Sequence, residues 1–168
     1  HKDKHGIIGF QGAFHGKTLG SQMIGGKPKE KKWLPWHDSS IYHLPYPDYL
    51  NGVDESNGKK FFISSINELI KKGVNPDSLA AIFMEPYQGW SACFFPKNYV
   101  KTLASWARKH GILLVSDEVQ AGFGRTGKWF AYEHFGIEAD IVTCGKAISS
   151  SLPLSAVLGS REILNLSG

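Results

Sequence analysis

Residues 112–118 read ILLVSDE, four apolar residues followed by a serine and two acids. An apolar run of this kind fits a strand that is buried on both faces. Comparable runs occur at residues 6–10 (GIIGF), 79–84 (LAAIFM), 141–144 (IVTC) and 154–158 (LSAVL). Strands that are apolar throughout belong to parallel sheets covered by helices on both faces. The sequence therefore predicts the α/β fold class.

Segments whose apolar residues have the spacing of a helix lie between these apolar runs. Residues 61–72 (FFISSINELIKK) have apolar side chains at 62, 63, 66, 69 and 70, and Gly73 follows. Residues 96–110 (PKNYVKTLASWARKH) repeat the pattern, with Pro96 in the first turn and Gly111 beyond the end. Apolar residues three and four apart indicate one buried helix face, and proline at the start with glycine at the end is typical of helix limits. Two helices are predicted here.

The chain has 168 residues, which suits one domain, and 42% of them are hydrophobic, enough for a packed core. No apolar run approaches the roughly 18 residues of a membrane span. The formal charge is +4, and residues 27–32 (KPKEKK) carry most of it, with four lysines and one glutamate. This segment predicts a solvated loop, not a nucleic-acid surface. Cys93 and Cys144 lack the spacing of a disulfide framework or a metal site, which suits a reducing compartment.

Ligands of open α/β sheets bind beyond the carboxyl ends of the strands. The side chains that follow the apolar runs are therefore the candidates for a functional site. They are Phe14, His15, Glu85, Asp117, Gln120 and Lys146. A further helix is expected within residues 16–23 and a short strand at residues 41–44.

Two nucleotide-binding patterns occur in part. Residues 11–18 (QGAFHGKT) end in Gly-Lys-Thr after a strand, but a P-loop needs glycine at the first position so that backbone amides can wrap the phosphates. Gly122, Gly124 and Gly127 match G-x-G-x-x-G, yet residues 117–121 separate them from the strand. A dinucleotide-binding motif follows its strand directly. A nucleotide hydrolase and a Rossmann protein are the weaker alternatives.

A lysine and a carboxylate at strand ends also suit pyridoxal phosphate. Its chemistry requires a lysine amine for the cofactor's aldehyde and an acid that faces the pyridine nitrogen. Lys146 and Asp117 would supply these two groups, with Phe14 over the ring and Gln120 at the ring oxygen. Taken singly, each residue has an ordinary explanation, such as a loop lysine or a helix-capping aspartate.

Four stretches, taken together, resemble the class III (ω-amino-acid) aminotransferases, which are pyridoxal phosphate enzymes of fold type I. They are FHGKT at 14–18, EPYQG at 85–89, DEVQAGFGRTG at 117–127 and DIVTCGK at 140–146, the last followed by LPLSA at 152–156. Their order and approximate spacing also match, and the resemblance covers nearly the whole chain. Each nucleotide-like fragment lies inside one of these stretches, so the resemblance accounts for both.

The resemblance implies a role for each cofactor-binding residue. Lys146 would bond the cofactor and move a proton between substrate and cofactor. Asp117 would keep the pyridine nitrogen protonated. Val119 and Phe14 would pack on opposite faces of the ring, and Gln120 would hydrogen-bond the ring oxygen. Lys146 and Asp117 are thus the expected catalytic residues.

The resemblance assigns fewer residues of this chain to the substrate than to the cofactor. The resemblance places Glu85 there, as a gate for a carboxylate-binding arginine elsewhere in the family. His15 is expected to support or pack against the site and not to act as an acid or base. Two departures from the family pattern occur: Ala147 replaces a frequent glycine, and residues 90–95 (WSACFF) replace a glycine-containing loop that bears on substrate fit.

Residues 1–168 are expected to form the central part of the large, pyridoxal-phosphate-binding domain, with an N-terminal segment and a C-terminal small domain outside it. The implied activity moves an amino group from an ω-amino acid or amine, such as 4-aminobutyrate or ornithine, to a 2-oxo acid such as 2-oxoglutarate. A decarboxylase or aminomutase that uses the same cofactor is the alternative. The resemblance also implies a homodimer in the full-length protein. The expected location is the cytoplasm, with the mitochondrion as the alternative. No metal, nucleic acid or membrane partner is expected.

Overall fold

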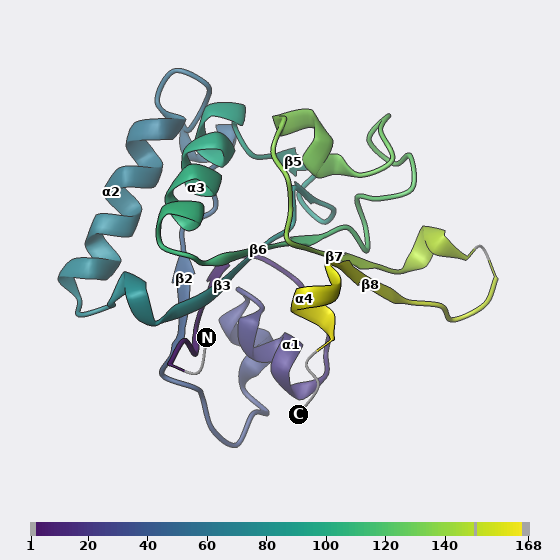
Figure 1. Cartoon of the computed structure of the whole chain (residues 1–168), viewed down its shortest axis with the longest axis horizontal. Helices are drawn as coiled ribbons and strands as arrows, with labels where there is room; N and C mark the ends of the chain where they lie inside the picture. Colours follow the sequence, from purple (N-terminus) through teal and green to yellow (C-terminus); the bar gives the residue numbers. More distant parts are fainter. Residues whose placement is uncertain (1–2, 150, 166–168) are drawn as a thin grey trace.

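A six-stranded sheet forms the centre of the computed structural model, which describes residues 3–149 and 151–165 (Figure 1). The strand order is β2-β1-β3-β6-β7-β8. Neighbouring strands run parallel except β8, which pairs antiparallel with β7. The strands are β1 (Gly6–Phe10), β2 (Ile41–Leu44), β3 (Leu79–Met84), β6 (Leu113–Asp117), β7 (Ile141–Cys144) and β8 (Ala156–Gly159). The predicted α/β class with a mostly parallel sheet is confirmed.

Helices cover both faces of the sheet (Figure 1). The longer helices, α2 (Gly58–Lys71) and α3 (Lys97–Lys109), pack together on one face. The short helices α1 (Leu19–Ile24) and α4 (Arg161–Leu164) lie on the other side. Short elements connect these parts. They are η1 (Pro28–Lys31), η2 (Tyr49–Asn51), η3 (Pro76–Ser78), η4 (Ala131–Phe135), η5 (Lys146–Ile148) and the hairpin of β4 (Tyr87–Gln88) and β5 (Cys93–Phe94).

Helix α2 differs from its prediction in two ways. It begins at Gly58, three residues before the predicted start, where a side chain would overlap Asn98 of α3. Its buried stripe is also narrower, because Phe62 and Ile66 are buried whereas Ile63 is 39% exposed. Positions 62 and 66 share one face of a helix, and position 63 lies about 100° away from that face. The apolar spacing alone predicted a wider buried face for α2 than the structure shows.

An aromatic cluster joins β1 to the helical layer. Tyr99 of α3 is fully buried, and its ring centre lies 5.3 Å from that of Phe62 and 5.6 Å from that of Phe95. Phe10, the last residue of β1, packs edge-on against Phe95 at 5.0 Å. Edge-to-face pairs contribute roughly 0.5–1.5 kcal/mol each beyond the apolar area they bury. The cluster fixes the carboxyl end of β1, where the chain enters the loop that carries Phe14.

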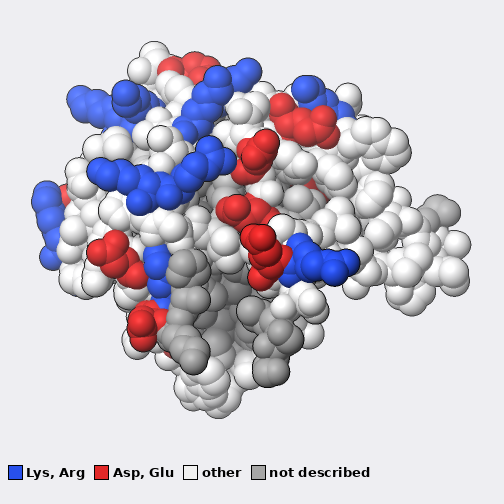
Figure 2. Space-filling view, viewed as in Figure 1, with Lys and Arg blue, Asp and Glu red and all other residues white. Residues whose placement is uncertain are grey.

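The surface of the helical layer is charged, and the opposite edge of the sheet is apolar. Figure 2 shows Lys and Arg side chains spread over α2 and α3, with acidic side chains close by. At the far edge, Leu152, Leu154, Val157 and Leu158 are each at least 46% exposed. None of the helices in the described part of the chain is long and apolar enough to cross a membrane. The β8 edge is therefore one of the exposed apolar surfaces in the described part of the chain.

Candidate active site

The carboxyl ends of the parallel strands surround a pocket of about 340 Å³. This volume lies within the range of small-molecule sites, roughly 300–1,000 Å³. Besides His15, six of the residues that line the pocket are those predicted from the sequence to hold the cofactor or face the substrate. They are Phe14, Glu85, Asp117, Val119, Gln120 and Lys146. The fold thus brings together residues that lie up to 132 positions apart in the chain, between 14 and 146.

Asp117 is the last residue of β6 and lies at the pocket with its side chain 10% exposed. Its Oδ1 accepts hydrogen bonds from the backbone N–H of Val119 at 3.1 Å and from the hydroxyl of Thr143 at 3.3 Å. Its Oδ2 lies 2.7 Å from Nδ1 of His15. A nearly buried carboxylate requires such donors. Asp117 is therefore held in one orientation beside the pocket.

His15 supports Asp117 from the loop after β1. Its side chain is 3% exposed, and its ring centre lies 5.8 Å from that of Phe83. Since the Asp117 carboxylate accepts, Nδ1 of His15 is the donating nitrogen. The other ring nitrogen, Nε2, is buried and has no hydrogen-bond partner among the residues that the structure describes. This geometry matches the supporting position that the sequence suggested for His15.

Glu85 follows β3 and is 7% exposed. Its Oε2 accepts a hydrogen bond from the backbone N–H of Phe14 at 3.0 Å. Burial raises the pKa of Glu85 to about 7, although the Phe14 hydrogen bond and the charges of His15 and Lys27 lower it in part. Glu85 thus fixes the backbone at Phe14 and lies beside the pocket, where the sequence placed it. Its role as a gate stays a prediction.

Two glycines allow the strand ends to approach closely. A Cβ on Gly89 would overlap the side chain of Gln120. A Cβ on Gly145 would lie 3.1 Å from Cγ1 of Val119, closer than ordinary van der Waals contact. Both contacts involve predicted cofactor-binding residues. The positions of Val119 and Gln120 therefore depend on glycine in neighbouring strand-end loops.

Lys146 begins η5 directly after Gly145 and has a φ of 43°, in the left-handed region. This conformation is uncommon for a residue with a side chain and costs of order 1–3 kcal/mol. Such strained residues cluster at active sites and ligand clamps. The backbone conformation of Lys146 thus supports its assignment to the site independently of the sequence pattern.

Lys27 and Trp90 also line the pocket; Trp90 belongs to the loop 90–95 that the sequence linked to substrate fit, whereas Lys27 was not predicted as a site residue. The Lys27 Nζ lies over the rings of Phe14 and Trp90, 5.7 Å and 5.0 Å from their centres. The expectation that residues 27–32 are a solvated loop is wrong for Lys27. Gly26 explains the difference, because a side chain there would overlap the backbone at Phe10, so only glycine lets this segment run beside β1. No spacing pattern in the sequence signals that approach.

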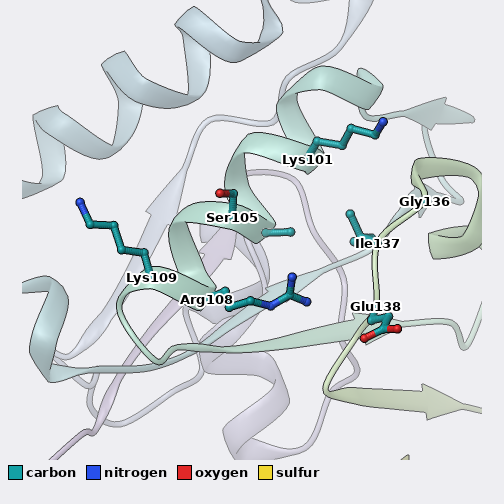
Figure 3. A pocket seen from close by; sticks show the side chains of 8 residues that line it. Lys101, Ser105, Arg108, Lys109, Gly136, Ile137 and Glu138 are labelled. Atoms are coloured by element: carbon teal, nitrogen blue, oxygen red, sulfur yellow. The ribbon is translucent and has the colours of Figure 1, made fainter.

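A larger surface hollow of about 810 Å³ lies between α3 and the segment 136–138 (Figure 3). It shares no lining residue with the strand-end pocket. Figure 3 shows the Lys101 and Lys109 side chains pointing in different directions, away from any common centre. A small ligand needs polar groups that converge. The strand-end pocket is therefore the candidate active site.

The sequence model described as aminotransferase class-III matches residues 1–167. This chain belongs to the class III aminotransferases. The match spans every residue that lines the pocket, so the class III aminotransferase motifs and the geometry of the site coincide.

Individual relatives agree with this family. The class III chain is 34% identical over 167 residues to a probable 4-aminobutyrate aminotransferase of Bacillus subtilis, covering 96% of this chain and 38% of the relative. It is 37% identical over 163 residues to a leucine/methionine racemase of Thermococcus litoralis, covering 95% and 37%. The fold is similar to the crystal structure of an (S)-enantioselective omega-transaminase from Thermomicrobium roseum, with a TM-score of 0.84 and 31% identity over 97% of this chain and 37% of that one. The chain spans less than two-fifths of the length of these relatives.

Proposed function

We propose that residues 1–168 are the central part of the large domain of a pyridoxal-phosphate-dependent aminotransferase. The enzyme would move an amino group from an ω-amino acid or amine, such as 4-aminobutyrate or ornithine, to a 2-oxo acid such as 2-oxoglutarate. The observation that carries this proposal is the presence of Lys146 and Asp117 in one strand-end pocket. We extend it to a homodimer, as the family resemblance implies, and to a reducing compartment, first the cytoplasm and second the mitochondrion, which suits the two unpaired cysteines.

The residues of the pocket fit pyridoxal phosphate. The cofactor has an aldehyde, a planar ring and a ring nitrogen that becomes a stronger electron acceptor when protonated. Lys146 offers a primary amine, Asp117 a carboxylate held by three hydrogen bonds, and Val119 an aliphatic surface. Phe14 adds an aromatic ring, and Gln120 adds an amide that can donate to a ring oxygen. The donor set and the pocket volume are those that such a ring needs.

Each residue would then have a defined task. Pyridoxal phosphate, when bound, would supply a carbonyl for the amino group and a ring that accepts electrons. Asp117 places negative charge where a protonated ring nitrogen forms a charge-assisted hydrogen bond. His15 keeps that carboxylate oriented. The Nζ of Lys146 takes the proton that leaves the amine-bearing carbon of the substrate. Val119 and Phe14 keep water from the two faces of the ring.

Racemisation is a second candidate, because the Thermococcus litoralis relative carries that name at 37% identity. A racemase returns a proton to the same carbon from the opposite side, and it consumes no 2-oxo acid. A requirement for a 2-oxo acid therefore separates the two reactions. The same Lys146 amine serves both, so this pocket alone favours neither. The 4-aminobutyrate aminotransferase relative supports transamination as the first candidate.

Borohydride reduction of the full-length enzyme with pyridoxal phosphate tests the assignment. Reduction should fix the cofactor to the peptide that contains Lys146, and Lys146→Ala should abolish both the label and turnover. Lys128→Ala, an exposed lysine in the same half of the chain, is the matched control and should change neither. Label on another lysine, or the absence of label, would exclude the proposed site. Inversion of an L-amino acid without any 2-oxo acid would favour the racemase.

A further inference from the structure

Backbone hydrogen bonds place Lys27 beside the loop that carries Phe14. The amide N–H of Gly26 donates to the carbonyl of Ala13 at 2.8 Å, and the amide N–H of Gly12 donates to the carbonyl of Gly26 at 2.9 Å. The residue before Lys27 is thereby paired with the loop after β1. A side chain at position 26 would overlap the backbone of that loop, so the approach requires glycine. Lys27 therefore starts from a fixed backbone position.

The Lys27 ammonium lies over two aromatic rings that line the pocket. Its Nζ is 5.7 Å from the ring centre of Phe14 and 5.0 Å from that of Trp90. The electron-rich face of an aromatic ring attracts a cation that lies within about 6 Å of the ring centre. The Lys27 side chain is 29% exposed, and its ion pair with Oε1 of Glu30 is long, at 3.8 Å. One positive charge thus links the two rings.

Trp90 is itself anchored to the loop that carries Phe14. Its Nε1 donates a hydrogen bond to the carbonyl of Gly12 at 2.8 Å. A Cβ on Gly12 would lie 3.1 Å from Cζ2 of Trp90, so the indole packs directly on the backbone just before Phe14. These contacts hold the indole although Trp90 is 62% exposed. Trp90 therefore offers the Lys27 ammonium a ring with a fixed position.

The Phe14 ring lacks the aromatic neighbours that Phe10 has. Phe10 of β1 packs against three other rings, whereas Phe14 belongs to none of the aromatic pairs in the described residues. The hydrogen bond with Glu85 holds the backbone N–H of Phe14 and leaves the rotation of its side chain free. In this part of the chain, the contact with Lys27 is thus the directional interaction of the Phe14 ring.

We propose that Lys27 is a positioning residue that holds the Phe14 ring in its stacking orientation through cation–π contacts with Phe14 and Trp90. The inference rests on the proposed function, in which Phe14 covers one face of the pyridoxal phosphate ring. It requires no contact between Lys27 and the cofactor or the substrate. Without the Lys27 charge, the Phe14 ring rotates more freely and covers the cofactor less well. Loss of Lys27 therefore weakens cofactor binding through Phe14.

Absorbance titration of the cofactor-free, full-length enzyme with pyridoxal phosphate tests this role. Lys27→Met keeps the apolar stem and removes the charge, and we expect it to weaken the affinity roughly 3- to 10-fold, as loss of a cation–π contact does. Lys27→Arg should restore most of the affinity, because a guanidinium group also stacks on aromatic faces. Lys29→Met, at an exposed lysine of the same segment, should bind the cofactor like the wild type.

A double-mutant cycle shows whether Lys27 acts through Phe14. Phe14→Leu removes the ring, so Lys27→Met should cause little further loss of affinity in that background. Equal losses with and without the Phe14 ring would mean that Lys27 reaches the cofactor by another route, and the positioning role would be wrong. An affinity of Lys27→Met equal to that of the wild type would also overturn it.

A measurement without cofactor separates this inference from the proposed function. The fluorine NMR signal of para-fluorophenylalanine, placed at position 14 of the full-length enzyme, reports the surroundings of that ring. Lys27→Met should shift the signal, whereas Lys29→Met should leave it in place. An unchanged signal in Lys27→Met would overturn the role of Lys27 and leave the aminotransferase intact. A shifted signal in an enzyme that fails to bind pyridoxal phosphate would support the contact between Lys27 and Phe14 and overturn the proposed function instead.

Discussion

The Nδ1 atom of His15 lies 2.7 Å from Oδ2 of Asp117, although the two residues are 102 positions apart in the chain. The contact connects the loop after β1 with the end of β6, which are separated in the sheet by β3. Asp117 has no other hydrogen-bond donor at Oδ2 among the described residues. The Oδ2 atom of the proposed cofactor-binding carboxylate is therefore held by one imidazole ring, whereas Oδ1 is held by Val119 and Thr143, and His15 is a positioning residue.

This dependence predicts non-additive effects on catalysis. In the full-length enzyme, Asp117→Asn should lower transamination by orders of magnitude, because it removes the charge and keeps the shape. His15→Phe keeps a ring of similar size and should lower kcat up to about 100-fold through misplacement of Asp117. The double variant should be no slower than Asp117→Asn, since the two residues act as one unit. Stopped-flow measurement of the half-reaction with 4-aminobutyrate checks this cycle.

Thermal unfolding of the same variants supplies the control. His134→Phe replaces a histidine that bonds Thr126, a residue that does not line the pocket, and should leave the half-reaction unchanged. Losses in kcat that add up in the double variant would mean that His15 acts independently of Asp117, and the positioning role would be wrong.

A methyl group at position 89 should displace Gln120 without unfolding the protein. The Cβ of Gly89→Ala would overlap Cγ and Cδ of Gln120, and the side chain of Gln120 can rotate away. We expect a loss of about 10-fold or more in kcat/KM and a weaker affinity for pyridoxal phosphate, measured by absorbance titration. Gly20→Ala is the matched control because it meets no atom within 4 Å and lies in α1. Alanine is favoured over glycine in helices, so this control should retain activity and stability. Equal affinity for the cofactor in both variants would contradict the importance of the Gly89–Gln120 contact.

The sequence predicted the sheet and most of the pocket for one reason. Continuous apolar runs mark strands buried on both faces, and the residues after such runs meet at one edge of a parallel sheet. Asp117 and Lys146 follow two of these runs, so their proximity could be predicted, although their roles came from the family resemblance. The antiparallel direction of β8 could not be predicted, because an apolar run carries no information about strand direction.

The remaining differences arise from tertiary contacts. Lys27 belongs to a segment whose composition is that of a solvated loop, and only the close passage of Gly26 beside Phe10 brings it to the pocket. The left-handed backbone of Lys146 depends on its surroundings, since lysine itself disfavours that conformation. Neither the position of Lys27 nor the backbone conformation of Lys146 produces a periodic pattern or a characteristic spacing in the sequence. Both lysines line the strand-end pocket on which the proposed function depends.

Glu118 should be a major source of stability in the loop after β6. It is fully buried, and its carboxylate accepts hydrogen bonds from the backbone N–H groups of Ala131 and Tyr132, at 2.9 Å and 3.0 Å, and from the hydroxyl of Ser116. Glu118→Gln would place an amide NH₂ against one of these donors. We expect the free energy of unfolding to fall by about 1–3 kcal/mol, as for a buried donor left unpaired. Urea unfolding of the full-length protein measures this, with Glu162→Gln, at an exposed position, as the control. A loss equal to that of the control would mean that the buried hydrogen bonds contribute little.

Glu85 makes the free energy of unfolding depend on pH, and its raised pKa means that this free energy falls as the pH rises. Burial raises the pKa from 4.5 to about 7, so the folded protein holds a proton that the unfolded chain releases between these values. The contribution of Glu85 is therefore fully present below about pH 4.5 and is lost as pH rises through about 7. The shift corresponds to about 3 kcal/mol at most.

Glu85→Gln should remove this pH dependence, because an amide cannot lose a proton in this range. Urea unfolding of the full-length protein at pH 5 and pH 7.5, without added ligand, should show the wild type losing about 2–3 kcal/mol relative to the variant as the pH rises. Other titrating groups are present in both proteins and cancel in the comparison. The amide oxygen that Glu85→Gln introduces can still accept from the backbone N–H of Phe14, so the variant should keep the local backbone. Glu162→Gln, whose side chain is exposed, should show no change relative to the wild type between the two pH values. A constant difference between wild type and Glu85→Gln would show that Glu85 is ionised across this range in the folded protein.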